Sequence, residues 1–432
     1  MRIKMILLGS SFLLQFRDIG DRLSYLILLP LLRVLSKGYF FITYPRMIEM
    51  QQVQKILIIA LNKGIGDAVL YSPALNKLRK EFPKAQITIV VNSYVKELVK
   101  RFRSIDKILI YNCQTMKWKE KIRFIRNLRI QRFDLAFDFH WYKFLESAVL
   151  AFLSGSKDLV GFNHDFRSLF FNHRYKPDFE NSHFADLCLG LVQSIGIKNN
   201  GIPSFENIQI SEIEKSNCSK LLKDEAIGEQ DLIIGVQPGA RDAIDVVDKR
   251  WSSTGYAHLA DYLIEKYQAK ILLLGDTSEK NRGEEVTLKM KHSPINFIGR
   301  TSIGEVIALL KRLDLLICNN SGLLHLAVAL NIPTVSFGGV NVVRWGPFSK
   351  NEKHIVSNGE VEEAIRTVDR QLSLIIDFRT KYRTIIHPLS ISPRSVAIAL
   401  VQPSQPLRRS RQRRRPSMGR DNLPAGRKES ER

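Results

Sequence analysis

KILIIALNKGIGDAVLYSPALNKLRKEFP, residues 55–83, contains the pattern that decides the fold. Its first residues, Lys55–Leu61, form an apolar run of strand length. The glycine-containing loop Asn62–Asp67 follows, and apolar residues then recur at helical spacing over Ala68–Phe82, where Pro83 ends the pattern. A buried strand that leads through a tight loop into a helix is the first part of a βαβ unit, and it predicts a parallel sheet.

The same alternation of strand and helix occurs in both halves of the chain. In the first half we expect further strands at Gln86–Val91, Ile108–Tyr111 and Leu135–Phe139, and a helix at Lys117–Arg132. In the second half we expect strands at Asp231–Val236, Lys270–Leu274, Leu315–Cys318 and Pro333–Phe337, and helices at Tyr256–Tyr267, Ile303–Arg312 and Ser321–Leu330. The pattern predicts an α/β protein with two facing, Rossmann-like, doubly wound domains.

Composition divides the chain into four expected parts. Residues 53–200 and 201–378 are the two Rossmann-like domains, separated by a polar stretch near residue 200. Residues 1–52 mix apolar runs with Arg and Lys, which predicts an amphipathic extension that either lies at a membrane surface or packs on the body. Residues 379–432 are rich in Arg, Ser, Pro and Gly, a composition that predicts a disordered, basic tail.

The formal net charge of +22 is unevenly distributed. Residues 379–432 carry 14 Lys and Arg against 3 Asp and Glu, so half of the excess lies in the tail. That tail is either simply solvated or binds an anionic partner, lipid or nucleic acid, and we expect no specific nucleic-acid target. The body is moderately basic, which suits an anionic substrate or membrane surface. The four cysteines lack zinc-like spacing, which predicts reduced thiols, no metal site and a cytoplasmic protein.

The loop after the first strand is the first candidate site. Gly64 and Gly66 permit a tight turn and a close approach of a ligand to the main chain, and the helix that follows turns its positive end toward an anion. No third glycine completes the dinucleotide-binding fingerprint, which argues against a nicotinamide oxidoreductase. Asp67 either caps this helix or acts as a general base that faces a cleft between the domains.

A second candidate site follows a strand of the second half. Gly239, in the segment QPGA at 237–240, provides a loop that a ligand can approach closely. Lys249 follows a short distance later and can contact a phosphate as a point charge. A lysine in such a loop is otherwise a solvated surface residue.

The segment NNSGLLHLA at 319–327 is the third candidate site. It follows a predicted strand and starts a helix, at which Asn320 or Ser321 is a suitable cap. Backbone amides at Ser321, Gly322 and Leu323 would form a phosphate cradle supported by the helix dipole. His325 lies one turn further along, where it either directs a ring nitrogen at the same anion or packs in the core.

Three segments in this order resemble the ADP-heptose:lipopolysaccharide heptosyltransferase family, which is glycosyltransferase family nine. They are LNKGIGDAVLYSPALNKLRKEFP at 61–83, QPGA with DKRW between 237 and 251, and FIGRTSIGEVIALLKRLDLLICNNSGLLHLAVALNIPTVSFGG at 297–339, followed by WGP at 345–347. FDLAFDFHW and SGSKDLVGF, within 133–162, are similar to the same family. The resemblance covers residues 53–348, and the motifs are specific as a set rather than singly. It implies the GT-B fold, in which two Rossmann-like domains face each other.

The resemblance also implies roles for individual residues. These are Asp67 as the catalytic base, Lys249 at the donor phosphate, Ser321, Gly322 and His325 at the diphosphate, Thr301 near the nucleotide base, and Asp276 or Glu279 at the ribose. Two departures bear on the sugar rather than on the enzyme class: Asn320 stands where the family usually has Asp, and Ser252 stands where it usually has Pro.

The activity expected from this resemblance is an inverting, metal-independent glycosyl transfer without a cofactor. The donor would be a nucleotide-diphosphate sugar, ADP-heptose by resemblance, and the acceptor a lipopolysaccharide core or another glycolipid or glycan of the cell envelope. Peripheral contact with the inner membrane is a further expectation. The alternatives are a GT-B-like nucleotide-sugar epimerase or hydrolase, and a non-catalytic basic protein that binds through its tail.

Overall fold

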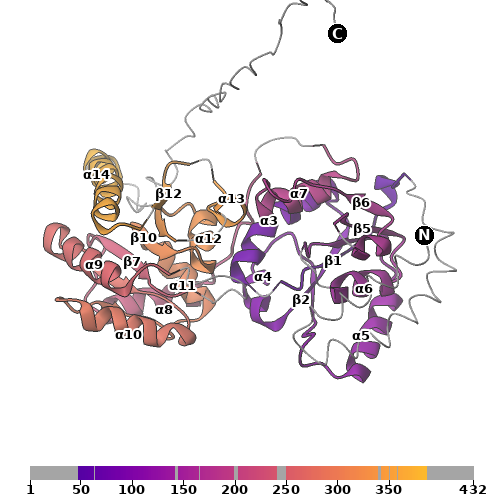
Figure 1. The fold of residues 1–432 in the computed structure, drawn as a ribbon, viewed down its shortest axis with the longest axis horizontal. Helices are drawn as coiled ribbons and strands as arrows, with labels where there is room; N and C mark the ends of the chain where they lie inside the picture. The colour runs from indigo at the N-terminus through magenta and orange to yellow at the C-terminus, as the bar shows by residue number, and fades with distance from the viewer. Residues whose placement is uncertain are drawn as a thin grey trace, which may run out of the picture.

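A computed structural model of the chain describes residues 47–386 except 63, 142–144, 165, 199–202, 241–249, 339–341, 350 and 358. Most of the expected N-terminal extension and residues 387–432 of the expected tail therefore lie outside the described residues, and so does Lys249. The described part forms two α/β halves side by side (Figure 1). Within it, no helix combines the length and the apolar character that a bilayer crossing requires.

The first half is built on a sheet of six parallel strands in the order β3-β2-β1-β4-β5-β6. The strands are β1 (Lys55–Ile59), β2 (Gln86–Val91), β3 (Lys107–Ile110), β4 (Leu135–Asp138), β5 (Asp158–Phe162) and β6 (His173–Tyr175). Its helices are α3 (Ile65–Glu81), α4 (Lys96–Val99), α5 (Trp118–Gln131), α6 (Leu145–Leu153) and α7 (Phe184–Gln193), with short 3₁₀ turns η1 (Met50–Gln52), η2 (Ser93–Val95) and η3 (Phe166–Phe170). The four strands predicted from the sequence of this half are confirmed.

The second half repeats this plan with six parallel strands in the order β12-β11-β10-β7-β8-β9. The strands are β7 (Ile233–Gln237), β8 (Lys270–Leu273), β9 (Ile295–Asn296), β10 (Leu315–Asn319), β11 (Thr334–Phe337) and β12 (His354–Ser357). Its helices are α8 (Glu212–Asp224), α9 (Ser253–Tyr267), α10 (Lys280–Lys289), α11 (Ile303–Leu310), α12 (Gly322–Ala329), α13 (Val342–Trp345) and α14 (Val361–Ile386), with the 3₁₀ turn η4 (Thr277–Glu279). Two parallel, doubly wound sheets confirm the predicted fold class.

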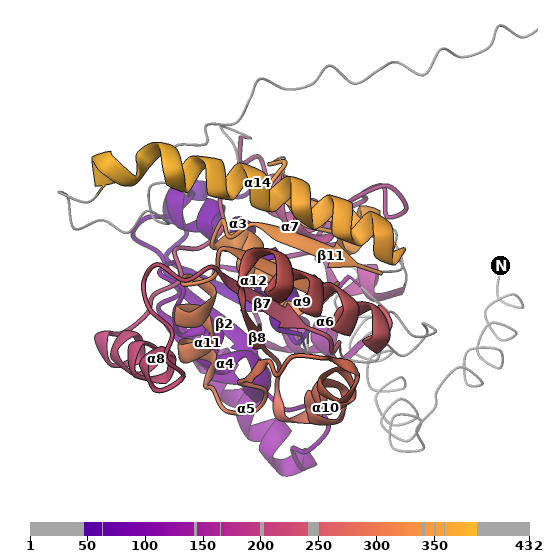
Figure 2. The ribbon, with the colours of Figure 1, turned by 90° about the vertical axis from the view of Figure 1, so that its left-hand side faces the viewer.

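Helix α14 runs along the outside of the second half, beside α9 and the β12 edge of the sheet (Figure 2). The carboxylate of Asp369 accepts hydrogen bonds from Tyr262, Lys266 and Tyr267 of α9, at 2.6–2.9 Å. The helix continues past residue 378, where the second domain was expected to end, because no glycine or proline interrupts residues 361–386.

The order of strands places the ligand-binding edge of each half. The chain goes from β1 to β2 on one side and later returns to β4 on the other, and β7 lies in the same way between β8 and β10. Open parallel sheets bind ligands at this switch point, beyond the carboxyl ends of the strands. Helices α3 and α12 begin at those ends and pack against each other where the halves meet (Figure 1). The two edges therefore face one another.

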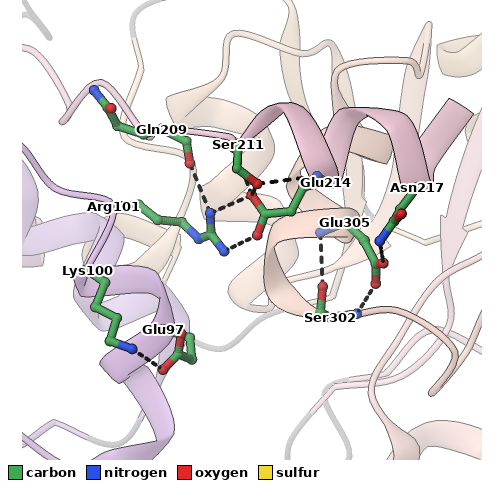
Figure 3. A network of polar contacts seen from close by, with 9 residues as sticks. All are labelled: Glu97, Lys100, Arg101, Gln209, Ser211, Glu214, Asn217, Ser302 and Glu305. Carbon is green, nitrogen blue, oxygen red and sulfur yellow. Dashed lines mark hydrogen bonds and ion pairs between the residues drawn. The ribbon is translucent and has the colours of Figure 1, made fainter.

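A polar network joins the halves on the side of α4 (Figure 3). Arg101, just after α4, donates two parallel hydrogen bonds to the carboxylate of Glu214 in α8, one of them at 2.9 Å. Helix α8 packs on α11, and a side chain at Gly304 of α11 would lie 1.7 Å from Glu214 Oε1. Only glycine at position 304 leaves room for this ion pair. The network thus ties α4 of the first half to α8 and α11 of the second.

We expect this network to make stability depend on pH. Hydrogen bonds from Arg101 lower the pKa of Glu214 from 4.5 to about 2. Because the folded-state pKa is depressed, the ion pair stabilises the protein above pH 4.5 and its contribution is lost as the pH falls toward 2. Glu214→Gln keeps the side-chain shape that caps α8, and we expect it to lower the free energy of unfolding at pH 7 by about 1 kcal/mol.

Thermal unfolding of both proteins between pH 7 and pH 3.5 checks this prediction. The difference in Tm between wild type and variant should narrow as the pH falls. Glu212→Gln is the matched control, because Glu212 lies in the same first helical turn, is 87% exposed and pairs only with exposed Lys215. If the difference in Tm stayed constant with pH, or if Glu212→Gln lowered Tm as much as Glu214→Gln does, the Arg101–Glu214 ion pair would not be the source of the pH dependence.

Candidate active site

A cavity of about 670 Å³ lies between the two halves, at the carboxyl ends of the strands. Its volume is in the range of small-ligand sites. The expected site residues that line it are Gly64, Gly66, Asp67, Asp276, Glu279, Thr301, Asn320, Ser321, Gly322, Leu323 and His325. Gly239 lies behind this wall, where a side chain would come within 2.3 Å of Glu279 Oε1. Lys249 lies outside the described residues, so its expected place at a phosphate stays a prediction.

The two glycine loops meet at the back of this cavity. A β-carbon on Gly66 would lie 2.7 Å from the Cδ2 atom of His325 and 3.5 Å from the Cα atom of Gly322. A β-carbon on Gly322 would lie 3.2 Å from Cβ of Ile65 and 3.4 Å from the backbone nitrogen of Gly66. Glycine at both positions therefore lets the start of α3 approach the start of α12. Two positive helix ends converge here, and such an arrangement favours an anion.

The start of α12 keeps its amide groups available to a ligand. Ser321 occupies the N-cap position, as expected, but its side chain makes no capping hydrogen bond to the helix. The hydroxyl group instead donates to Oε1 of Gln237, at the end of β7. The first amides of a helix have no intrahelical acceptor. The neighbouring Asn320 adds no negative charge, so an anion at this helix end meets donors rather than a carboxylate.

His325 is buried on the first turns of α12 beside Gly66. Burial, and repulsion from His183, lower the pKa of its imidazole from 6.5 to about 3, so the ring is neutral at physiological pH. Its Nδ1 atom is buried and makes no hydrogen bond. Buried polar atoms are nearly always satisfied in folded proteins, and among the described residues this atom has no hydrogen-bond partner. A neutral imidazole can donate one hydrogen bond to an anion without adding charge.

Asp67 lies in the first turn of α3, which begins at Ile65 rather than at Ala68 as the sequence pattern predicted. The earlier start follows from Gly64, which is extended and takes the N-cap position. The Oδ2 atom of Asp67 accepts a hydrogen bond from the backbone N–H of Gly64 at 3.1 Å. The carboxylate therefore does cap the helix, and it also lines the cavity. Both interpretations of Asp67 that the sequence left open are compatible with this position.

A buried glutamine links the walls of the second half. Gln237 donates from Nε2 to the Glu279 carboxylate at 3.0 and 3.3 Å, and it accepts from Ser321. Glu279 also accepts from the backbone N–H of Asp276 at 3.0 Å. Gln237 is only 3% exposed, which fixes Glu279 and Ser321 relative to each other. Gln237 was named in the QPGA motif without being given a role. Its position at the end of a central strand could have indicated one.

Other lining residues were also missed from the sequence. Tyr94, in η2 of the first half, reaches across the cavity to Asp276 Oδ2 at 3.4 Å, and Glu97 and Leu98 line the same wall. Trp345, which was quoted from the sequence only within the WGP motif, also lines the cavity, and the centre of its ring lies 5.9 Å from that of Trp141. These residues depend on how the halves pack together, which no local pattern encodes. Across the ranges that the structure describes, no three His, Cys, Asp or Glu side chains come together as metal ligands.

Comparison with known proteins agrees with this geometry. The profile of the family described as glycosyltransferase family 9 (heptosyltransferase) matches residues 121–373, which is more than half of the chain. Lipopolysaccharide heptosyltransferase 2 of Escherichia coli K12 is 25% identical over 299 residues, which cover 66% of this chain and 82% of that protein.

Solved structures show the same fold. A glycosyl transferase family 9 protein from Veillonella parvula superposes with a TM-score of 0.66 at 21% identity, and covers 75% of this chain and 98% of its own. E. coli ADP-heptose lps heptosyltransferase II superposes with a TM-score of 0.63 at 22% identity, and covers 74% and 99% of the two chains. Two parallel sheets that face each other across one cavity form the GT-B fold. The chain belongs to glycosyltransferase family 9.

Proposed function

We propose that this protein transfers a heptose from ADP-heptose to a lipopolysaccharide core, with inversion at the anomeric carbon and without a metal ion. The donor and the acceptor class are those that the names of the similar heptosyltransferases state. One observation carries the proposal: the carboxylate of Asp67 and the amide-bearing start of α12 line the same cavity, although they come from different halves of the chain.

The donor binds, in this proposal, to residues 201–378. The amides of Ser321, Gly322 and Leu323 bind the diphosphate, with Lys249 and the neutral ring of His325 as further donors. The carboxylate of Glu279 accepts hydrogen bonds from the ribose hydroxyls, and Gly239 leaves room for that carboxylate. Thr301 lies near the base. Asn320 lies beside the sugar that is transferred. The support for Glu279 over Asp276 is that Glu279 is half-buried and held by Gln237, whereas Asp276 is exposed.

The acceptor binds to residues 53–200, which contribute Asp67. The acceptor hydroxyl oxygen forms a bond to the anomeric carbon from the side opposite the diphosphate, and the bond from that carbon to the diphosphate oxygen breaks. The electron pair goes to the departing ADP, and the hydroxyl proton goes to the Asp67 carboxylate. Attack from the opposite side inverts the configuration.

Charge on the departing diphosphate is stabilised by the converging starts of α3 and α12. Prearranged amides that point at developing negative charge lower the barrier without having to reorient. Gly66 and Gly322 permit this convergence, because a side chain at either position would push the two helix ends apart. We propose that these donors, with Lys249, supply the stabilisation that a divalent metal gives to other glycosyl transfers.

Gln237→Leu tests how the donor is held. Leucine fills the same space but cannot bond to Glu279 or Ser321, so both lose their fixed geometry. We expect the affinity for ADP, measured by calorimetry, to fall about tenfold, the effect of roughly one lost hydrogen bond in a buried site. Gln371→Leu is the matched control: Gln371 is a buried glutamine of α14 that donates to the Glu352 carbonyl at 3.0 Å. An equal loss of affinity in both variants would contradict the role of Gln237.

A transfer assay tests the function itself. The full chain is incubated with ADP-heptose and a lipopolysaccharide core that lacks its outer heptose, with and without EDTA. We expect ADP release and a heptose added to the core, unchanged by EDTA, and the new linkage should have the configuration opposite to the donor's. Release of ADP without acceptor at the same rate would indicate a hydrolase or epimerase, and transfer from another nucleotide sugar would reject the donor.

We propose that this reaction takes place in the cytoplasm. Three buried cysteines, Cys188, Cys218 and Cys318, support this compartment, because they are free thiols. A shift in the thermal unfolding temperature with ADP, and none with other nucleoside diphosphates, would support the choice of nucleotide independently of the acceptor.

A further inference from the structure

Helix α5 differs from the other long helices of the first half in how little of it is covered. Of its 14 residues only Leu128 is buried. Three large apolar side chains are exposed on it: Trp118 is 67%, Ile122 41% and Ile130 76% accessible. The helix lies at the outer end of the first half, away from the second half (Figure 1). An exposed group of large apolar side chains marks an interaction surface.

The exposed apolar residues share one face of α5 with basic residues. Trp118, Ile122 and Ile130 fall on a spacing of four, with Arg126 between the last two, and residues four apart are neighbours on a helix. Residues 117–132 contain seven Lys and Arg against one Glu. The basic residues are Lys117, Lys119, Lys121, Arg123, Arg126, Arg129 and Arg132, and all except Lys121 are exposed. We name this surface, formed by Trp118, Lys119, Ile122, Arg123, Arg126, Arg129 and Ile130, the α5 face.

The acidic groups near α5 lie away from this face. Lys121 is half-buried and turns inward, where it pairs with Glu146 at 2.6 Å. Glu120 binds the backbone N–H of Lys117 at the start of the helix. Lys119 lies over the Trp118 ring at 5.5 Å, so cation and aromatic group are adjacent at the outer surface. The α5 face is therefore both cationic and apolar.

Apolar surface continues from α5 toward the edge of the sheet. A hollow of about 280 Å³ lies between the helix and edge strand β3, lined by Leu109, Phe124 and Ile130 together with Lys107, Asn127 and Gln131. Lys107 is exposed at its rim. The hollow extends the apolar area without adding negative charge.

We infer that the α5 face docks on the surface of a bilayer that contains anionic phospholipid, with α5 lying in the plane of the interface. Interfacial helices combine Trp and aliphatic side chains, which enter the headgroup region, with Lys and Arg, which contact anionic headgroups. A nucleic acid would use the cations but leave Ile122 and Ile130 in water. Docking would bring the half that carries Asp67 to the membrane. This inference does not depend on the sugar that is transferred, because docking needs neither donor nor acceptor.

Vesicle binding by the full chain tests the inference. The vesicles are 3:1 phosphatidylethanolamine:phosphatidylglycerol or phosphatidylcholine alone, and binding is measured by cosedimentation. We expect binding to the anionic vesicles only, weakened by salt. Arg126→Glu/Arg129→Glu should lower the affinity at least tenfold, and Ile122→Ser/Ile130→Ser should lower it without changing the charge. Circular dichroism and Tm should show that both variants fold.

Brominated phosphatidylglycerol distinguishes the α5 face from the Arg-rich tail. Bromine quenches only tryptophans that enter the bilayer, so quenching should occur in wild type and be largely absent in Trp118→Phe. Lys220→Glu/Lys223→Glu on α8 is the matched control, because it makes the same change of charge at two exposed positions and should bind as wild type does. The inference would be overturned if the α5 variants bound vesicles as the wild type does, or if the α8 control lost as much vesicle affinity as they do. It would also be overturned if quenching survived in Trp118→Phe. Binding of RNA that requires Arg126 and Arg129 without quenching would overturn it as well.

Discussion

Asp67→Asn is expected to lower kcat by about 10²–10⁴-fold, the usual contribution of a general base, while the protein folds and binds ADP as the wild type does. Asparagine keeps an oxygen that can accept from the backbone N–H of Gly64, so the cap at the start of α3 is preserved. It cannot accept a proton from the acceptor hydroxyl. The expected loss therefore lies in the chemical step, and single-turnover kinetics with bound donor measures it directly.

Glu97→Gln is the matched control for this prediction. Glu97 is a second carboxylate on the same wall of the cavity, so it is the rival candidate for the base. A hydrogen bond from Lys100 at 2.9 Å lowers the pKa of Glu97, which makes it a weaker base. We expect the Glu97 variant to retain most of its kcat. A large loss there, with near-normal turnover in the Asp67 variant, would transfer the role to Glu97.

Gly66→Ala is expected to lower kcat/KM by about 100-fold. The added methyl group would lie 2.7 Å from the His325 ring, closer than such atoms approach, so the start of α3 must move away from α12. A displacement of about 1 Å between reacting groups is enough for a loss of this size. Overpacking of this kind also costs about 1–3 kcal/mol of folding free energy, which a shift in Tm measures.

A double-mutant cycle separates the collision from other effects of the methyl group. His325→Ala removes the ring that the methyl group meets. The loss of unfolding free energy in the Gly66→Ala/His325→Ala variant should therefore be smaller than the sum of the losses in the two single variants. Gly228→Ala is the control for adding a methyl to a loop, since only Asp231 Oδ2 lies near it, at 3.7 Å. Strict additivity in the cycle would show that the two residues do not press on each other.

Local patterns were sufficient to predict the strand–loop–helix units that build the site. The apolar runs before Asn62, Gln237 and Asn319 form central strands whose apolar residues are buried, and burial on both faces explains why these runs are continuous. The glycines that follow them permit tight loops. Parallel strands end at a common edge of their sheet, so the loops at Gly66–Asp67 and Asn320–His325 could be expected at the ligand-binding edges of the two domains. Glu279 and Thr301 were expected there from the family resemblance alone. The short strands at the sheet edges are different: β9 has two residues and β6 has three, too few for a periodic signal.

The tertiary contacts around the cavity could not be predicted. Gln237 acquires its partners Glu279 and Ser321 only when three strand ends meet, and Tyr94 reaches Asp276 over 182 positions of sequence. The sequence predicted a helix at Lys117–Arg132, but the exposure of α5 depends on which described elements pack against it, and that could not be predicted. These contacts result from tertiary packing, and no local pattern in a single sequence predicts them.

The pairing of α3 with α12 has an electrostatic consequence for the order of events. Two like poles held face to face repel one another unless a counter-ion lies between them. Asp67 offsets the positive end of α3, but no acidic residue lies in the first turn of α12, so the repulsion between the two helix starts is only partly offset by the protein. If a diphosphate binds between these helix starts, as we propose, its charge offsets this repulsion, so we expect the two halves to hold together more tightly with nucleotide bound than without it.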